Sequence, residues 1–170
     1  MSRENALKVA AIVRDAGGCI VGRTRLQKIA YLLCSTGLEE GLSFAYKHYG
    51  PYSEELAIAA REASLLGLVS ENEQTAAWGG TYSTYKVSEK SGANVDPARS
   101  KLTSMAAKAN AVELELAATA VFLAKDYSDP WAETARRKPE KVGDGRLERA
   151  KELYCQLANI KAPVPLPPIN

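Results

Sequence analysis

The amino-acid sequence predicts an α+β protein that is mostly α, in which a winged-helix-like module with a small β-hairpin packs on a C-terminal helical layer. Two observations predict this fold. Helical and strand patterns alternate in residues 1–96, whereas only helical patterns follow in residues 97–161. In addition, 46% of the 170 residues are hydrophobic and 25% are charged, so the chain can bury a core. Residues 162–170 form a proline-rich tail that we expect to be extended.

Two amphipathic helices open the winged-helix-like module. Hydrophobic residues recur at helical spacing in residues 4–16, so we expect one helix there. A second helix with one apolar face ends at Gly37. Its start is predicted by a capping box, because Thr24 is followed three residues later by Gln27.

A short strand, a third helix and a hairpin complete the module. Residues 44–49 alternate in the manner of a strand, and Gly50-Pro51 predicts a turn directly after them. Ser53 is the expected cap of the third helix. The patterns of residues 68–71 and 82–88 predict the two strands of the hairpin. This order departs from that of a winged helix-turn-helix, because the extra strand precedes the third helix and not the second.

The second half of the chain shows helical patterns. Residues 91–97 are small and polar and end in proline, which predicts a linker. Residues 111–124 are apolar nearly all round, which is typical of a helix buried on several sides. Further helices are expected at residues 98–109, 131–137 and 147–157. The proline-rich tail is then either a strap over this helical layer or a disordered end.

The sequence features of most enzyme classes are absent. The chain has no glycine-rich phosphate-binding motif and no G-x-S-x-G turn, so neither nucleotide chemistry nor a hydrolase nucleophile is indicated. His48 is the single histidine, and Cys19, Cys34 and Cys155 lie far apart, so we expect no metal site and no cofactor. We therefore predict that the protein is not an enzyme.

The sequence also indicates a compartment. An odd number of widely spaced cysteines suits a reducing environment. The first residues are polar and run into an amphipathic segment, so we expect no signal peptide. The longest apolar stretch, Leu116 to Ala124, is far too short to cross a bilayer. We therefore expect a cytoplasmic, bacterial-type protein that makes no membrane contact.

Two dense motifs lie in residues 22–69. They read Gly22-Arg-Thr-Arg-Leu-Gln-Lys-Ile-Ala-Tyr-Leu-Leu and Phe44-Ala-Tyr-Lys-His-Tyr-Gly-Pro-Tyr-Ser-Glu-Glu-Leu, and Gly67-Leu68-Val69 follows them. With these motifs the sequence resembles the YwgA-like proteins of bacteria and archaea. More distantly it resembles the SocA-like or Panacea domains, which are found in antitoxins and in an adaptor for protein degradation. The resemblance implies a winged-helix-like fold and a binding role without known catalysis.

The same motifs predict a contact surface. Arg25 and Lys28 lie three residues apart on the second helix, opposite its apolar face, and Tyr31 extends this polar stripe. Tyr49 and Tyr52 flank the predicted turn, and tyrosine is favoured at interfaces. We hypothesise that these residues form a partner-binding patch. The alternative is that the tyrosines pin the turn onto the second helix, with Arg25 paired to a nearby glutamate.

Trp78, at the expected hairpin tip, is a further candidate for partner binding. An exposed tryptophan would anchor a partner, because large aromatic side chains dominate binding energies at interfaces. The alternative is that the indole ring folds back over a neighbouring element. The exposure of Trp78 separates these two interpretations.

A winged-helix-like outline also allows DNA binding, and the charges test this. The third helix would be the recognition helix, but it begins with Glu54-Glu55 and has only Arg61 as a basic residue. The hairpin and linker, residues 71–96, carry two lysines against four acidic residues and would repel phosphate. Basic residues gather instead in the helical half, where our candidates for nucleic-acid contact are Arg136, Arg137 and Lys138. Local ion pairs with neighbouring glutamates are the alternative explanation of these charges.

The sequence thus predicts a non-catalytic protein-binding module of the antitoxin or proteolytic-adaptor type, with a toxin or a protease substrate as its protein partner. The alternative is a DNA-binding transcriptional regulator whose basic surface lies in the helical half or is completed in a homodimer. A third class, a small hydrolase or nuclease, would need a well-formed pocket with converging carboxylates.

Overall fold

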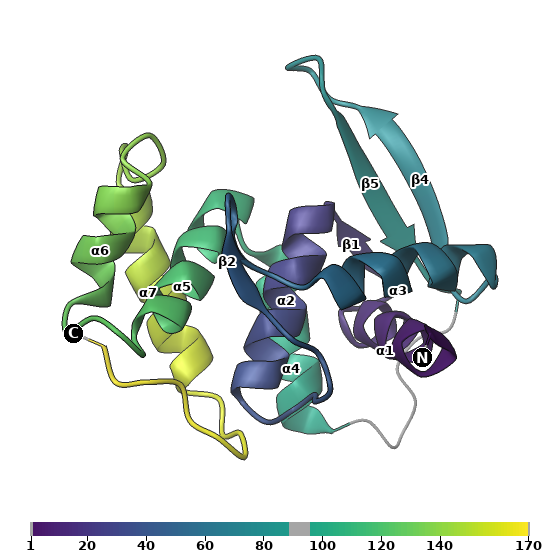
Figure 1. The fold of residues 1–170 in the computed structure, drawn as a ribbon, viewed down its shortest axis with the longest axis horizontal. Helices are drawn as coiled ribbons and strands as arrows, with labels where there is room; N and C mark the ends of the chain where they lie inside the picture. The colour runs from purple at the N-terminus through teal and green to yellow at the C-terminus, as the bar shows by residue number, and fades with distance from the viewer. Residues whose placement is uncertain (1, 89–95, 170) are drawn as a thin grey trace.

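The computed structural model describes residues 2–88 and 96–169, and Figure 1 shows the arrangement of their elements. The winged-helix-like module contains α1 (Ser2–Asp15), β1 (Cys19–Val21), α2 (Arg23–Ser35), β2 (Ala45–Lys47), β3 (Gly50–Tyr52), α3 (Glu54–Leu65), β4 (Ser70–Thr75) and β5 (Thr81–Lys86). The helical layer contains α4 (Pro97–Lys108), α5 (Ala111–Leu123), α6 (Pro130–Arg137) and α7 (Arg146–Ala158). The predicted fold class, α+β and mostly α, is thereby confirmed. Of the linker predicted at residues 91–97, residues 91–95 lie outside the described residues.

A three-stranded antiparallel sheet closes the winged-helix-like module, in the strand order β1-β5-β4. β1 places Ile20 opposite Tyr85, and both side chains are buried in the core. β1 is not predicted from the sequence, because a strand of three residues is too short to show a periodic pattern. With β1 in front of α2, the module has the element order of a winged helix, and β2 and β3 are an insertion between α2 and α3. β4 and β5 project away from the helices (Figure 1).

Gly50-Pro51 lies in a strand and not in a turn. Ala45 pairs with Tyr52 and Lys47 pairs with Gly50, so the turn of this second hairpin consists of residues 48 and 49. The strand expected at residues 44–49 is therefore shorter, and the turn expected at Gly50-Pro51 is wrong. A proline is tolerated here because β3 pairs with β2 alone in a two-stranded sheet, so no second neighbour requires its missing N–H group.

The predicted capping box is also wrong. α2 begins after Gly22, whose φ of 102° ends β1 and redirects the chain, and no side chain caps the helix. Thr24 therefore lies inside α2, and Gln27 is buried with partners elsewhere. The predicted cap of α3 is confirmed, because the hydroxyl of Ser53 accepts a hydrogen bond from the Leu56 N–H over 3.1 Å.

Helix α5 joins the two halves of the molecule. It packs against α2 and β3 of the winged-helix-like module and against α6 and α7 of the helical layer. Most of its residues are buried, and Leu116, Ala117 and Ala120 are fully buried. The prediction of a helix buried on several sides at residues 111–124 is thus confirmed. Its small alanines allow neighbouring helices to approach closely.

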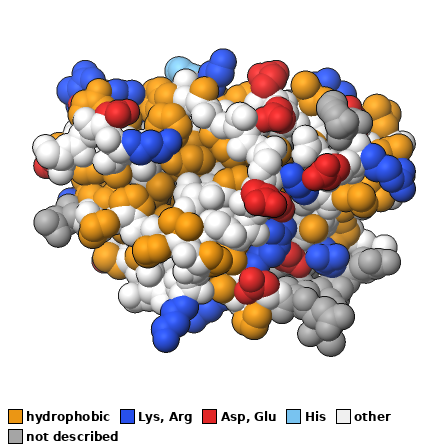
Figure 2. Space-filling view, turned by 60° about the horizontal axis from the view of Figure 1, so that its bottom comes forward, with side chains coloured by type: hydrophobic (Ala, Val, Ile, Leu, Met, Phe, Trp, Pro, Cys, Tyr) orange, Lys and Arg blue, Asp and Glu red, His pale blue; other side chains and the backbone are white. Residues whose placement is uncertain are grey.

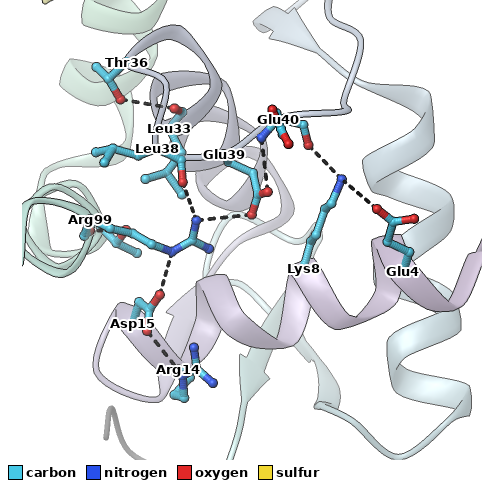
Figure 3. A network of polar contacts seen from close by, with 11 residues as sticks. Glu4, Lys8, Arg14, Asp15, Leu33, Thr36, Leu38, Glu39, Glu40 and Arg99 are labelled. Carbon is cyan, nitrogen blue, oxygen red and sulfur yellow. Dashed lines mark hydrogen bonds and ion pairs between the residues drawn. The ribbon is translucent and has the colours of Figure 1, made fainter. Parts of the chain in front are cut away.

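A polar network ties α4 to α1 and to the loop that follows α2 (Figure 3). The guanidinium of Arg99 donates to the Asp15 carboxylate over 2.7 Å, to the Leu38 carbonyl over 2.6 Å and to the Glu39 carboxylate over 3.2 Å. The Asp15 carboxylate also lies 3.3 Å from Nε of Arg14. The side chain of Asp15 is 1% exposed and that of Arg99 is 14% exposed. These charges are held away from water, so each depends on the other for compensation.

The proline-rich tail forms a strap that contacts both the end of α2 and the helical layer. The Val164 N–H donates to the Thr36 carbonyl over 2.9 Å. The Tyr154 hydroxyl donates to the Pro167 carbonyl, and Leu166 is buried in the core. Of the two alternatives for the tail, the strap is therefore the one that residues 162–169 adopt.

We expect Arg99→Met to lower the free energy of unfolding by about 3 kcal/mol, because Asp15 would remain buried with most of its compensation removed. The matched control is Lys101→Met, an exposed position on the same helix, with an expected change below about 0.5 kcal/mol. Urea unfolding followed by circular dichroism measures both values. Equal stabilities of the two variants would contradict the role given to Arg99.

Candidate functional site

The two dense sequence motifs form one unit in the structure. Gln27, on α2, holds the backbone of Ser53 with both ends of its amide: Nε2 donates to the Ser53 carbonyl over 2.9 Å, and Oε1 accepts from the Ser53 N–H over 2.8 Å. The next residue, Lys28, donates from Nζ to the Pro51 carbonyl over 2.8 Å. Because Ser53 also caps α3, helix α2 fixes both β3 and the start of α3.

Gly50 lies where β3 packs against α5. Its φ is +91°, a region that residues with a Cβ rarely adopt. A Cβ at this position would lie 2.5 Å from Oγ1 of Thr119. Thr119 is fully buried, and its hydroxyl has no hydrogen-bond partner among the described residues. Glycine is therefore required here for the β2–β3 hairpin to lie close to α5.

A group of buried charges lies behind the hairpin. The carboxylate of Glu115, on α5, forms ion pairs with Lys138 at 2.8 Å and with Lys141 at 2.7 Å. Lys138 also donates to the His48 carbonyl over 3.1 Å. The Lys141 amine lies 4.6 Å from the centre of the Tyr49 ring, in a cation–π contact. These contacts connect the hairpin to the segment that follows α6.

Lys28 is the most completely buried of these charged residues, with 1% of its surface exposed. Burial lowers the pKa of its amine to about 8; Glu115 opposes this shift, whereas Lys138 and Lys141 add to it. The amine therefore changes its charge at mildly alkaline pH. Its hydrogen bond to the Pro51 carbonyl can be made by either form, since a neutral amine still carries N–H donors.

A pocket of about 470 Å³ opens in front of this unit, between α2, α3 and the three-stranded sheet. Its volume lies in the range of roughly 300–1,000 Å³ that is usual for binding sites. The pocket is lined by apolar side chains, among them Leu26 and Leu56, and by Arg23, Arg61, Tyr49 and Tyr52. Glu71 is the one carboxylate among the described residues that line it. Converging carboxylates, which a hydrolase or nuclease would need, therefore do not line this pocket.

Two of the residues predicted to bind a partner are not on the surface. Lys28 is 1% exposed and Tyr31 is 5% exposed. The Tyr31 ring packs against Phe44 and Phe122, with ring centres 5.2 and 5.9 Å apart. The exposed polar stripe expected on α2 is thus wrong, because α2 is covered by β3 and α5 as well as by α4 and the sheet. Neither side chain can belong to a surface patch in this structure.

Arg25 connects elements of the molecule to one another. Its Nε donates to the Val21 carbonyl over 2.9 Å, and its Nη1 donates to the Ala109 carbonyl. Burial lowers the pKa of its guanidinium. The alternative interpretation, in which Arg25 pairs with a glutamate at the start of α3, is therefore wrong as well. Arg25 joins α2 to β1 and to the junction between α4 and α5.

The remaining candidates for partner binding are accessible. Tyr49 is 51% exposed and, with Tyr52, lines the pocket. Trp78 is 77% exposed at the tip of the β4–β5 hairpin, where its ring lies over Gly80. The structure thus brings Tyr49, Tyr52 and part of Lys28 together at the pocket and leaves Trp78 and Arg25 apart from it.

The basic residues proposed for nucleic-acid contact form ion pairs within the protein, although Arg136 and Arg137 share a single carboxylate. Arg136 and Arg137 both donate to the Glu133 carboxylate, over 3.0 and 2.7 Å, and these bonds lower the pKa of Glu133 to about 2. Lys138 is 3% exposed and pairs with Glu115. The exposed basic surface expected at residues 136–138 is therefore wrong for Lys138, and the local ion pairs of the alternative explanation are present.

Two residues of this site are not predicted from the sequence. The partners of Gln27 are backbone atoms, so no residue type in the sequence could indicate them. From the sequence Arg61 is only a basic residue of the third helix, whereas the structure places it in the lining of the pocket. One feature of the sequence could have indicated the pocket beside Arg61. Ala57 and Ala60 are small residues on the same side of α3, and they leave space there.

Two further findings concern the described residues. No three histidine, cysteine, aspartate or glutamate side chains come together among them in a way that could hold a metal ion. In the same part of the chain, no helix combines the length and the apolar surface needed to cross a membrane. The chemistry that the pocket itself offers is hydrogen-bond donation beside apolar and aromatic surface.

The fold and the pocket define the class of protein: a winged-helix-like α+β protein with a helical layer and a pocket between α2 and α3. Over 71 residues the chain is 35% identical to the uncharacterized protein YwgA of Bacillus subtilis (strain 168), and the match covers 42% of this chain and 42% of YwgA. The chain is thus similar to YwgA over less than half of the length of either protein. No family model and no solved structure matches the chain.

We expect Gly50→Ala to destabilise the protein more than Gly79→Ala does. Both glycines have a φ near +90°, so both variants carry the strain of that backbone conformation, about 1 kcal/mol. Only at Gly50 would the new methyl group meet Thr119, which adds a further loss of about 2 kcal/mol. Thermal unfolding of the two variants measures the difference. Similar losses in both would show that the contact with α5 imposes no constraint.

The buried amine of Lys28 predicts a pH dependence of stability. Its folded-state pKa, about 8, lies below the ordinary value of 10.5, so the unfolded chain binds one more proton between these values. Its contribution to stability therefore rises as the pH rises through this window. Relative to Lys28→Met, the unmodified protein should gain about 2–3 kcal/mol from pH 7 to pH 10.

Urea unfolding at several pH values measures this difference. The Cys34 thiol, whose pKa burial raises to about 11, has the opposite effect over part of this range. Because Cys34 is present in both proteins, its effect cancels in the comparison. The control variant Lys101→Met, at an exposed lysine, should show a difference that does not change with pH. A constant difference for Lys28→Met as well would contradict the lowered pKa.

Proposed function

We propose that this chain is a non-catalytic protein-binding module of the antitoxin or proteolytic-adaptor type and that it binds its partner with α3 and the adjoining pocket. The observation that carries the proposal is the exposed apolar face of α3. Leu65 is 81% exposed and Ile58 45%, and Leu66, directly after the helix, is 50% exposed. Ile58, Arg61 and Leu65 follow helical spacing and share one face, and Arg61 also lines the pocket. Apolar side chains that are held in water next to a pocket are typical of protein-binding surfaces.

The charges favour a protein partner over DNA. In a winged-helix protein the N-terminal end of α3 would approach the bases, and here it carries the exposed residues Glu54 and Glu55. These two glutamates would repel a phosphate backbone. On the face shown in Figure 2, acidic and basic side chains are interspersed on the right, the side of the molecule that holds α1 and α3, and they form no continuous basic surface there. The alternative, a DNA-binding regulator, would have to use Arg136 and Arg137, which are paired with Glu133.

The resemblance to SocA-like and Panacea domains supports the antitoxin or adaptor type. In this chain the motifs that carry the resemblance build the unit of α2, β3 and the start of α3, and this unit forms the back of the pocket. A toxin or a protease substrate is accordingly the kind of partner that we propose. A cytoplasmic location is part of the same proposal.

We expect Leu65→Glu to abolish capture of the partner and to leave the fold intact, because Leu65 is exposed and contributes little to the core. The matched control is Val164→Glu, which makes the same charge change at a half-exposed valine in the tail strap. Tagged full-length proteins are used to recover partners from lysate of the source organism, with and without nuclease, and mass spectrometry identifies what is bound.

The proposal would be supported by a protein that is recovered in stoichiometric amount and stays bound after nuclease treatment and in high salt. The Leu65→Glu variant should no longer capture this protein, whereas Val164→Glu should still capture it. Recovery of DNA or RNA, with steep salt dependence and with loss of proteins on nuclease treatment, would contradict it and favour the regulator.

A further inference from the structure

The pocket between α2 and α3 contains hydrogen-bond donors that the protein itself does not use. The guanidinium of Arg61 makes no hydrogen bond or ion pair with another described residue. The same holds, within that part of the chain, for the hydroxyl groups of Thr24, Tyr49 and Tyr52. Four donors thus surround one cavity without an internal acceptor. An acceptor from outside would complete them.

The charge around the pocket is positive. Arg23, Lys28 and Arg61 line it, and Glu71 is the acidic residue among the described lining residues. Glu71 is already engaged, because it pairs with Arg23 at 3.3 Å and accepts a hydrogen bond from the Ser83 hydroxyl over 2.6 Å. The charge of Arg61 is therefore left without a carboxylate in the pocket, and the buried amine of Lys28 adds positive charge at its back. Charge complementarity selects an anionic occupant.

Part of the pocket lining is apolar. Leu56, Ala57 and Ala60 line the pocket on the α3 side, and the small alanines leave room for another side chain. The pocket borders the face of α3 on which Ile58 and Leu65 are exposed. An occupant that fills the pocket and continues over this face must carry both an anionic group and apolar surface. A folded or extended protein segment has this composition, whereas a free small anion has no group for the exposed helix face.

We propose that this pocket accepts an aspartate or glutamate side chain from the protein partner, with apolar neighbours of that residue lying on α3. The proposal rests on the proposed function and names the chemistry of the segment that is bound. The partner's carboxylate accepts hydrogen bonds from Arg61 and the hydroxyls that line the pocket and is held near the positive charge of Lys28. A guanidinium–carboxylate bond of this kind is stronger than a neutral hydrogen bond and fixes the orientation of the bound segment.

Selection from a phage-displayed random-peptide library on the immobilised full-length chain tests this proposal. We expect the enriched peptides to contain an acidic residue next to apolar residues. Arg61→Glu should weaken binding of such a peptide about tenfold. Ala57→Phe, which fills the pocket without changing its charge, should do the same. The control Lys101→Glu makes the same charge reversal at an exposed position on α4 and should leave the affinity unchanged. Circular dichroism confirms that each variant is folded.

A second selection, on the Arg61→Glu variant, gives the reciprocal result: lysine or arginine should replace the acidic residue in the enriched peptides. Enriched peptides without an acidic residue, or with equal affinity for Arg61→Glu, would overturn the pocket proposal but leave the protein-binding function in place. If succinate bound more tightly than any selected peptide, the pocket would prefer a free carboxylate. That result would overturn the proposal that the carboxylate comes from a protein. Selections that enrich no peptide would count against the proposed function as well.

Discussion

The hydrogen bonds from Gln27 and Lys28 to the backbone of β3 are the constraint on which the rest of the site depends. Both side chains are buried, and a buried amide or amine without a partner costs several times the net value of a hydrogen bond. The carbonyls of Pro51 and Ser53 have the same requirement. The side chains of α2 and the carbonyls of β3 and Ser53 satisfy one another's hydrogen bonds. Therefore α2, β3 and the first turn of α3 have one low-energy arrangement. The pocket lies between these three elements, so its shape follows from the same hydrogen bonds.

The two halves of the molecule are held together by contacts of different kinds. Helix α5 provides an apolar contact and brings Glu115 to the lysines behind the β2–β3 hairpin. Arg99 provides a polar contact with Asp15 on α1. Apolar burial is not directional, whereas a buried ion pair with several hydrogen bonds tolerates only one geometry. The apolar contact therefore supplies most of the attraction, and the polar contact fixes the orientation of the helical layer.

This construction separates a rigid back from an accessible front. Behind the pocket, the polar groups of Gln27 and Lys28 are fully engaged, and Gly50 allows β3 to lie against α5. In front of it, Arg61 and the exposed half of Tyr49 face outward on elements that this back holds in place. A partner that binds here would find donors that are already positioned, which reduces the entropy cost of binding. A binding role therefore suits the architecture without requiring a large conformational change.

The sequence by itself determined the helices and the cap of α3. The helix at residues 111–124 and the cap at Ser53 need only neighbours along the chain, and hydrophobic spacing and capping chemistry report such neighbours directly. The tertiary structure alone decided β1, the strand at Gly50-Pro51 and the burial of Lys28. A three-residue strand is stabilised by a distant strand, and Lys28 is bonded to a backbone carbonyl, which every residue type provides. The pocket was decided in the same way, because a cavity depends on which surfaces meet and on the space between them.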